Sequence, residues 1–226
     1  MKVYRTASLT AVWRRMANVD DHSINYVSLP MRFVAYILGI LDKNSVATIS
    51  ERTKIIDSAI RKLKPSCIVE IGAGFSSRQK KFRRIKFYKL DLPHFQKFGI
   101  DIIPFDIAND KLDLKIKNAL FIVEGVTMYL QEQEVLSLLR QIKKYKGHIL
   151  IDFFVRRNPP EKKNLREKIY KSLFKIIIGR NHLFDYRIGS FQDGICLLKS
   201  FGYKNVKRYD YGKLKSLDAL FYAKMG

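Results

Sequence analysis

Apolar side chains in the first 63 residues recur every three or four positions, which is the period of an amphipathic α-helix. Ile55, Ile56, Ile60 and Leu63, for example, follow this spacing. Pro65 then interrupts the pattern, because proline has no backbone N–H to continue a helix. The sequence therefore predicts an N-terminal helical segment over residues 1–63. The expected helices run from Ser8 or Thr10 to Arg15, from Ser28 and Pro30 to Leu41, and from Glu51 to Leu63 with Ser50 as the N-cap.

Beyond Pro65 the pattern changes to short apolar runs separated by polar segments. Strands that alternate with helices are typical of a mostly parallel sheet covered on both faces. The last two runs have no helix between them, so an antiparallel hairpin is expected at one edge. Residues 64–226 are thus predicted to form one α/β domain around a seven-stranded sheet, with the N-terminal helical segment packed on it. The expected strands are 67–71, 87–90, 100–105, 119–123, 148–154, a run after Gly202, and 217–223, with helices at 131–144 and 190–201.

Residues 155–187 do not fit this alternation and carry ten Lys or Arg. Within them Leu165, Ile169, Leu173 and Ile177 are spaced by four, which predicts a basic amphipathic helix. Three roles are open for this helical insert. The first is a helix packed on the domain with a solvated charged face. The second is a cap over the active site at the ligand end of the sheet, and the third is a helix that lies on a membrane surface.

The net charge of +22 is compatible with several partners. Nucleic acid, an anionic membrane face and acidic small substrates all attract such a chain, and a Lys-rich proteome gives the same excess with no specific partner. No RNP-like aromatic motif, zinc finger or GXXG clamp accompanies the charge. Nucleic acid is therefore left open as a partner but is not favoured.

Cysteine and histidine usage indicates a reduced protein without a metal site. Cys67 and Cys196 lie far apart, each in an apolar run, so both are expected to be reduced core residues. The four histidines form no metal-binding spacing. The uncharged apolar run at residues 33–41 is too short to cross a bilayer, and the first ten residues lack the apolar region of a signal peptide. We expect a cytoplasmic protein without a transmembrane segment.

A glycine turn follows the first expected strand. Gly72 and Gly74 remove side chains where the backbone turns tightly and approaches a ligand. Asp91 ends the next strand, 19 positions beyond Gly72, where a carboxylate can accept both hydroxyls of a ribose. The third glycine of a dinucleotide fingerprint is replaced by Ser77, and a cofactor without a pyrophosphate does not need it. The pattern favours S-adenosyl-L-methionine over NAD.

Three motifs in order resemble those of the leucine carboxyl methyltransferase family, which includes polyketide O-methyltransferases of the tetracenomycin type. They are residues 70–78 (EIGAGFSSR), Asp91-Leu92-Pro93, and residues 121–130 (FIVEGVTMYL). Arg52-Thr53 is similar to an Arg-Thr pair of the family. The resemblance covers roughly residues 48–154 and implies a Rossmann-like fold of class I S-adenosylmethionine-dependent methyltransferases. The chain is shorter than typical relatives, chiefly in the parts that cover the substrate.

The resemblance also implies a set of cofactor-binding residues. Arg52 would hold the methionine carboxylate, although a surface salt bridge is the alternative. Asp91 would take the ribose hydroxyls, and Glu124 matches a cofactor-contacting glutamate. A basic contact near the N-terminus of the family cannot be aligned securely here, with Arg14 and Arg15 both nearby. The remaining implied contacts are Gly72, Ala73 and Gly74 under the methionine and ribose, and Asp106 and Ile107 beside the adenine, where Asp106 has a turn or cap as its alternative role.

The expected function is methyl transfer to the carboxylate, or a hydroxyl, of a small molecule or peptide. A carboxylate is already ionised near neutral pH, so alignment supplies most of the catalysis and no general base is required; a hydroxyl would need one. No catalytic residue is assigned. Two alternatives remain. One is an RNA or protein methyltransferase that docks through its positive surface, and the other is a cofactor-binding protein that has lost its reaction.

Overall fold

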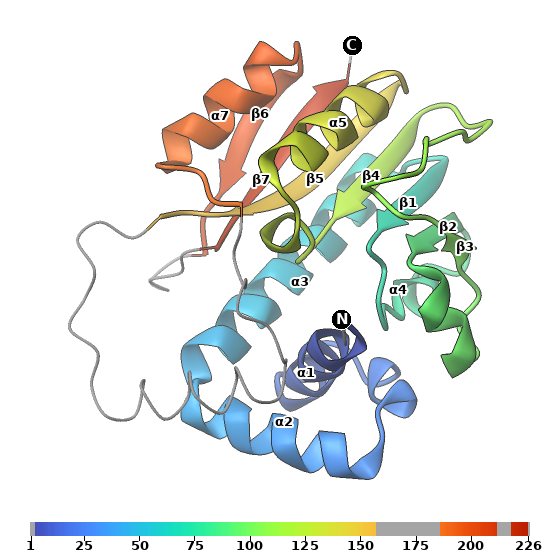
Figure 1. Cartoon of the computed structure of the whole chain (residues 1–226), viewed down its shortest axis with the longest axis vertical. Helices are drawn as coiled ribbons and strands as arrows, with labels where there is room; N and C mark the ends of the chain where they lie inside the picture. Colours follow the sequence, from blue (N-terminus) through green and yellow to red (C-terminus); the bar gives the residue numbers. More distant parts are fainter. Residues whose placement is uncertain (1–2, 157–185, 212–217, 226) are drawn as a thin grey trace.

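A computed structural model describes residues 3–156, 186–211 and 218–225, and it is built around one seven-stranded sheet (Figure 1). The strand order is β3-β2-β1-β4-β5-β7-β6. β7 is antiparallel to both of its neighbours, whereas the other pairs are parallel. The expected mostly parallel sheet with an antiparallel C-terminal pair is confirmed. The strands are β1 (Cys67–Ile71), β2 (Lys86–Asp91), β3 (Ile103–Pro104), β4 (Ala119–Val123), β5 (Gly147–Phe154), β6 (Lys204–Tyr209) and β7 (Asp218–Met225).

The two central strands are buried along their whole length. β1 and β4 are continuous apolar runs apart from Glu70, as expected for parallel strands covered on both faces. Their register pairs Ile71 with Val123. The residues that follow, Gly72 and Glu124, therefore emerge side by side at the carboxyl edge of the sheet.

Helices cover both faces of the sheet (Figure 1). α5 (Glu132–Lys143) and α7 (Phe191–Ser200) pack on one face, where Leu138 and Leu198 are fully buried in the main core. α3 (Lys43–Leu63) packs on the other face through Ile56 and Ile60. The short α4 (Arg78–Lys81) follows the glycine turn.

The N-terminal segment lies at the carboxyl edge of the sheet. It contains α1 (Val3–Met16), η1 (Ser23–Tyr26) and α2 (Leu29–Leu41), which form a separate apolar cluster. The indole N–H of Trp13 donates to the carbonyl of Ala35 at 2.8 Å and ties α1 to α2. Phe75 of the glycine turn is buried in the same cluster. The segment thus packs directly against the turn that carries the sequence motif.

Several expected boundaries are wrong. α3 begins at Lys43, not after Ser50, because Asp42 caps it by accepting from the backbone N–H of Ser45 at 3.1 Å. Ser50 is buried within the helix. α1 begins by Val3, earlier than Ser8 or Thr10.

The third strand is shorter than the expected 100–105. It covers Ile103–Pro104 alone, because Ile100 and Ile102 turn into the N-terminal apolar cluster. η2 (Pro93–Phe98) precedes it, and η3 (Thr127–Tyr129) follows β4.

The expected basic insert lies almost wholly outside the described residues. Its ends are described: Val155 forms an isolated parallel bridge with Ile188, and Arg156 donates its backbone N–H to the Ile188 carbonyl at 2.8 Å. The four apolar positions of the proposed amphipathic helix fall within 157–185. No helix in residues 3–156, 186–211 and 218–225 has the length and apolar character needed to cross a membrane.

Candidate functional site

The glycine turn between β1 and α4 requires glycine at its first position. Gly72 has φ +69°, and a Cβ there would lie 2.2 Å from Cγ2 of Val126. The backbone N–H groups of Gly72 and Ala73 donate to the carbonyl of Leu90, at 2.8 and 3.2 Å. Gly74 has φ +51°, and a Cβ there would lie 3.3 Å from the Cβ of Ala7. The turn is therefore wedged between the residues after β4 and helix α1.

Asp91 holds this turn from the end of β2. Its Oδ2 accepts from the backbone N–H of Gly74 at 2.6 Å, and its Oδ1 accepts from that of Leu92 at 2.8 Å. Burial raises the pKa of Asp91 to about 6, although the two backbone hydrogen bonds and nearby Lys89 act in the opposite direction. Each carboxylate oxygen has a second lone pair, so Asp91 retains accepting capacity for a ligand.

Glu124 lies at the end of β4 between three guanidinium groups. Its Oε1 accepts from Nη2 of Arg14 at 2.8 Å and from Nε of Arg52 at 3.0 Å, and its Oε2 accepts from Nη2 of Arg78 at 2.5 Å. Burial by itself would raise the pKa of Glu124, but the three arginines outweigh it and hold that pKa well below the usual range. Glu124 is therefore ionised, and it joins α1, α3 and α4 at one point.

Arg52 is buried on α3 and meets two further carboxylates. Its Nη1 lies 2.9 Å from Oδ2 of Asp152 on β5 and also pairs with Oδ2 of Asp218 on β7. Burial and their mutual charge raise the pKa of Asp152 to about 8, and burial also raises the pKa of Asp218. Oδ2 of Asp152 additionally accepts from the backbone N–H of Gly125 at 2.7 Å. This carboxyl pair therefore fixes both Arg52 and the turn that holds Glu124.

Arg78 extends the cluster to β1 and α3. Its Nη1 lies 3.0 Å from Oε1 of Glu70, which also accepts from the hydroxyl of Ser76 at 2.8 Å. Its Nε lies 3.5 Å from Oδ1 of Asp57, whose other oxygen pairs with Lys81. The cluster is thus a continuous network of buried charges along the carboxyl edge of the sheet.

Six of the eight residues expected to bind the cofactor gather at this edge. They are Arg52, Gly72, Ala73, Gly74, Asp91 and Glu124. The other two, Asp106 and Ile107, lie in the next turn. The backbone N–H of Phe105 donates to the carbonyl of Asp91 at 2.9 Å and sets this turn beside β2. There Asp106 caps the turn by accepting from the backbone N–H of Ala108 at 3.0 Å, and Ile107 packs half-buried on the main core.

Other charged residues of the cluster were not assigned from the sequence. Arg14 reaches Glu124, whereas its neighbour Arg15 pairs with Asp21 at the surface. Arg78, Asp152 and Asp218 were also not assigned. The sequence does predict a cationic partner for Glu70, because a carboxylate within a buried strand requires one. The sequence does not show which arginine supplies it.

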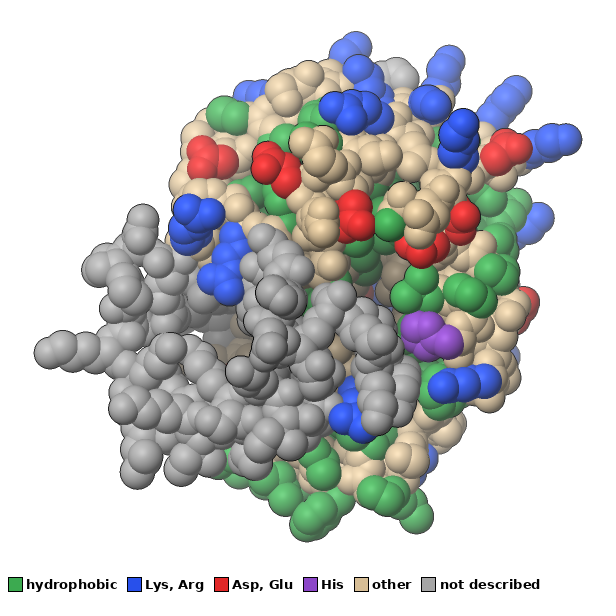
Figure 2. Space-filling view, in the orientation of Figure 1, with side chains coloured by type: hydrophobic (Ala, Val, Ile, Leu, Met, Phe, Trp, Pro, Cys, Tyr) green, Lys and Arg blue, Asp and Glu red, His purple; other side chains and the backbone are tan. Residues whose placement is uncertain are grey.

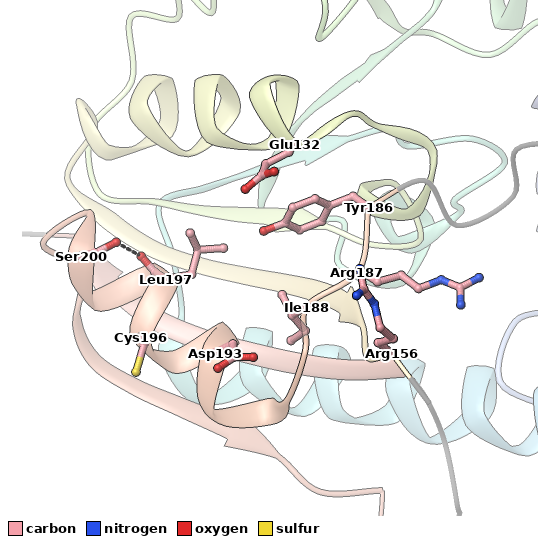
Figure 3. A pocket seen from close by; sticks show the side chains of 9 residues that line it. All are labelled: Glu132, Arg156, Tyr186, Arg187, Ile188, Asp193, Cys196, Leu197 and Ser200. Atoms are coloured by element: carbon pink, nitrogen blue, oxygen red, sulfur yellow. Dashed lines mark hydrogen bonds between the residues drawn. The ribbon is translucent and has the colours of Figure 1, made fainter. Parts of the chain in front are cut away.

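A cavity of about 610 Å³ lies between the start of α5 and α7, beyond the end of β5 (Figure 3). Glu132, Arg156 and Asp193 contribute both signs of charge to its wall, and the Tyr186 ring extends toward α5. Cys196 also lines it and is exposed, so the expectation that both cysteines are core residues is wrong for Cys196. Residue 196 falls on the outer side of α7, away from buried Leu198.

A second cavity of about 520 Å³ lies among α1, α2 and α3. Its wall is largely apolar and includes Met16, Ile40 and Val46, with Tyr211 and Ser50 contributing hydroxyl groups. In the part of the chain that the structure describes, no group of three or more His, Cys, Asp or Glu side chains is placed to bind a metal ion.

Neither a protein-family model nor a curated protein matches the sequence. Solved structures do match the fold. Human N-acetylserotonin methyltransferase, in complex with S-adenosylmethionine, aligns with a TM-score of 0.54 and 15% identity over 95% of this chain and 62% of that chain. The S-adenosylmethionine-dependent methyltransferase SibL, in its apo form, gives 0.51 and 13% over 80% of this chain and 58% of that chain. A protein from Bordetella parapertussis described as a possible exported protein gives 0.56 and 12% over 98% of this chain and 95% of that chain.

The chain spans about three fifths of the length of the two methyltransferases. At these sequence identities the structural similarity shows a shared fold and no more. The chain has the Rossmann-like α/β fold of class I S-adenosylmethionine-dependent methyltransferases, as the sequence motifs predicted.

Proposed function

We propose that the protein is an S-adenosylmethionine-dependent O-methyltransferase whose cofactor binds at the carboxyl edge of β1, β2 and β4. The observation that carries this proposal is the pairing of Arg52 with Glu124 beside the glycine turn. The methionine end of the cofactor is a zwitterion. A guanidinium suits its carboxylate, and a buried carboxylate suits its ammonium group. Arg52 and Glu124 offer both charges 3.0 Å apart.

The rest of the donor set also fits this cofactor. Asp91 has lone pairs available for ribose hydroxyls at the end of β2, and Gly72 and Gly74 supply the positive φ angles of the adjoining tight turn. Asp106 and Ile107 follow β3, where they would lie beside an adenine ring. Arg14 and Arg52 both donate to Oε1 of Glu124. We therefore assign Arg14 as the basic residue of the N-terminal segment that contacts the cofactor carboxylate.

S-adenosylmethionine supplies a methyl group on a sulfonium, which is reactive without a metal or a protein nucleophile. The protein then has to orient donor and acceptor and to exclude water. We infer a carboxylate acceptor on a small molecule or peptide, in keeping with the resemblance to leucine carboxyl methyltransferases. Such an acceptor is ionised at neutral pH and requires no general base.

Calorimetry with S-adenosylhomocysteine, the demethylated product, and with NAD tests the cofactor assignment. Binding of the first without the second supports the site. The Arg52→Gln variant should then bind at least tenfold more weakly, because a charge-assisted hydrogen bond contributes roughly 1.5–3 kcal/mol. Lys54→Gln is the matched control, since Lys54 is on the same helix but exposed. Equal affinity in the two variants would remove Arg52 from the site.

Radiolabelled S-adenosylmethionine tests the acceptor. Transfer to a small carboxylic acid or a peptide carboxylate as a base-labile ester supports the inferred acceptor. Transfer to RNA or to a protein side chain selects the alternative in which the positive surface docks a polymer. Cofactor binding without transfer to any of these acceptors favours a protein that retains the cofactor site without the reaction.

A further inference from the structure

A row of lysines follows the sheet edge opposite the candidate cofactor site. Each is exposed and lies within three residues of a strand terminus at that edge. They are Lys64, Lys86, Lys117, Lys146, Lys204 and Lys224. The strand register brings these termini together through the pairs Cys67–Lys86, Cys67–Ala119, Ala119–Gly147, His148–Lys224 and Lys204–Lys224. Figure 2 shows Lys and Arg side chains gathered along the upper edge of the molecule.

Helix ends explain only part of this charge. α3 and α5 both end at this edge, and cations near a helix C-terminus stabilise its dipole. That accounts for Lys64, which is the C-cap of α3, and for Lys143 in the last turn of α5. The other five lysines of the row lie within two residues of a strand terminus and outside the helices themselves.

The lysines of the row are not neutralised within the described part of the chain. None of the six forms an ion pair with another described residue. The row crosses six adjacent strands, which at about 4.8 Å per strand gives a length of about 24 Å. Like charges along such a row repel one another unless counterions or a polyanion cover them.

Nucleic acid fits this edge better than a membrane does. Amphipathic helices that bind membrane surfaces combine their charge with inserted apolar side chains. The exposed large apolar side chains of the described residues lie elsewhere, mostly on α2, as with Phe33 at 67% exposure. The edge instead offers partly exposed rings, including Tyr222, which stacks on His148 with ring centroids 5.6 Å apart. Proteins that bind single-stranded nucleic acid combine a narrow row of basic side chains with aromatic rings on which bases stack.

We propose that this lysine row binds the phosphodiester backbone of single-stranded nucleic acid. The row is separated from the candidate cofactor site by the length of the five-residue strand β4, about 16 Å. The bound strand therefore does not enter the cofactor site. It tethers the protein to a polyanion while the opposite edge remains open to a small acceptor.

Fluorescence anisotropy with a labelled 20-nucleotide oligouridylate, measured from 50 to 200 mM NaCl, tests the proposal. The unmodified protein should bind with an affinity that falls steeply with salt. The triple variant Lys117→Gln, Lys146→Gln, Lys224→Gln should bind at least tenfold more weakly at 100 mM NaCl. The slope of log affinity against log salt should shrink by about 2, since each lost contact to a single strand removes about 0.7.

A second triple variant, Lys43→Gln, Lys54→Gln, Lys80→Gln, removes the same charge from exposed positions away from the row. It should keep the affinity and slope of the unmodified protein. Equal weakening in both triple variants would mean that net charge alone drives binding and would overturn the proposal. So would absence of binding to the oligouridylate, or binding to phosphatidylglycerol vesicles in its place. Calorimetry with S-adenosylhomocysteine should give equal affinities for both triple variants, which separates this proposal from the cofactor assignment.

Discussion

Nε of Arg52 lies 3.0 Å from Oε1 of Glu124, across 72 positions of the sequence. The pair joins α3 to the end of β4 and is almost wholly buried. Buried ion pairs contribute little net stability, because desolvation offsets their attraction, but removing one partner leaves an uncompensated charge. A ligand that carries both charges offers a partner to each of these two side chains. A zwitterionic amino acid group satisfies that condition, which is why this pair carries the cofactor proposal.

Arg14 and Arg15 provide a direct comparison on one helix. Arg14→Gln should lower the free energy of unfolding by roughly 1–3 kcal/mol, because it removes one charged donor from buried Glu124. It should also weaken binding of S-adenosylhomocysteine. Arg15→Gln removes an exposed pair with Asp21 and should change stability by less than about 0.5 kcal/mol. Urea denaturation and calorimetry measure both effects. Equal effects of the two substitutions would contradict the assignment of Arg14.

Alanine substitutions at Gly72 and Gly99 distinguish the cost of backbone strain from the cost of a steric clash, because both glycines have φ +69°. Gly99→Ala places its Cβ in open space and should cost about 1–2 kcal/mol, the cost of a left-handed conformation. Gly72→Ala places its Cβ 2.2 Å from Val126 and should cost about 1–3 kcal/mol more. Adding Val126→Ala should recover part of that difference in urea denaturation. If both glycine variants lose the same stability, the close packing of the turn is not the constraint.

Local patterns predicted the elements whose burial is continuous. The apolar runs of β1 and β4 begin and end where expected, because strands buried on both faces tolerate few polar residues. The glycine turn and Asp91 were also recognisable, since each sits at a fixed place relative to a strand. For the same reason the expected cofactor contacts that end or follow β1, β2 and β4 meet at one edge of the sheet.

Long-range choices could not be predicted from local pattern. Asp42 and Ser50 are both acceptable N-caps in sequence, and Asp42 caps α3 because packing against α1 and α2 extends the helix. Arg14 and Arg15 are identical in chemistry, and the rotation of α1 alone decides which one reaches Glu124. The alignment of six lysines along one edge depends likewise on strand order, which periodicity does not encode.

The raised pKa of Asp91 predicts a pH dependence of cofactor binding. We assign its ionised form to accept hydrogen bonds from the ribose hydroxyls, and its pKa is about 6. The affinity for S-adenosylhomocysteine should therefore fall as pH is lowered from 7 through about 6. Asp91→Asn should bind more weakly at pH 7 and lose this pH dependence. Calorimetry between pH 5 and 8 checks both. A parallel decline in the Asn variant would assign the effect to another group.

Asp152 and Asp218 predict a pH dependence of stability. Burial raises both pKa values, to about 8 for Asp152, above the ordinary carboxyl value of 3.8. Between pH 3.8 and about 8 the carboxyl of Asp152 is protonated in the folded protein and ionised in the unfolded chain. The free energy of unfolding therefore falls as the pH rises through this range toward 8. Asp218→Asn removes one carboxyl and should flatten the decline. Thermal denaturation from pH 5 to 8 compares the two proteins, and identical slopes would exclude the carboxyl pair as the cause.

Glu124→Gln should separate a binding role from a structural one when it is paired with Asp57→Asn. Asp57 supports the same buried network through Arg78 and Lys81 but lies away from the glycine turn. Both substitutions remove a buried carboxylate charge and should lower the free energy of unfolding, by about 3–5 kcal/mol for Glu124, which faces three guanidinium groups.

The affinities should differ between these two variants. Glu124→Gln removes the charge that we assign to the cofactor ammonium and should weaken binding of S-adenosylhomocysteine by roughly 1–3 kcal/mol. Asp57→Asn should leave that affinity unchanged. Calorimetry at a temperature where both variants remain folded measures the difference. If both lose stability and neither loses affinity, Glu124 serves only to neutralise Arg14, Arg52 and Arg78 and does not contact the cofactor.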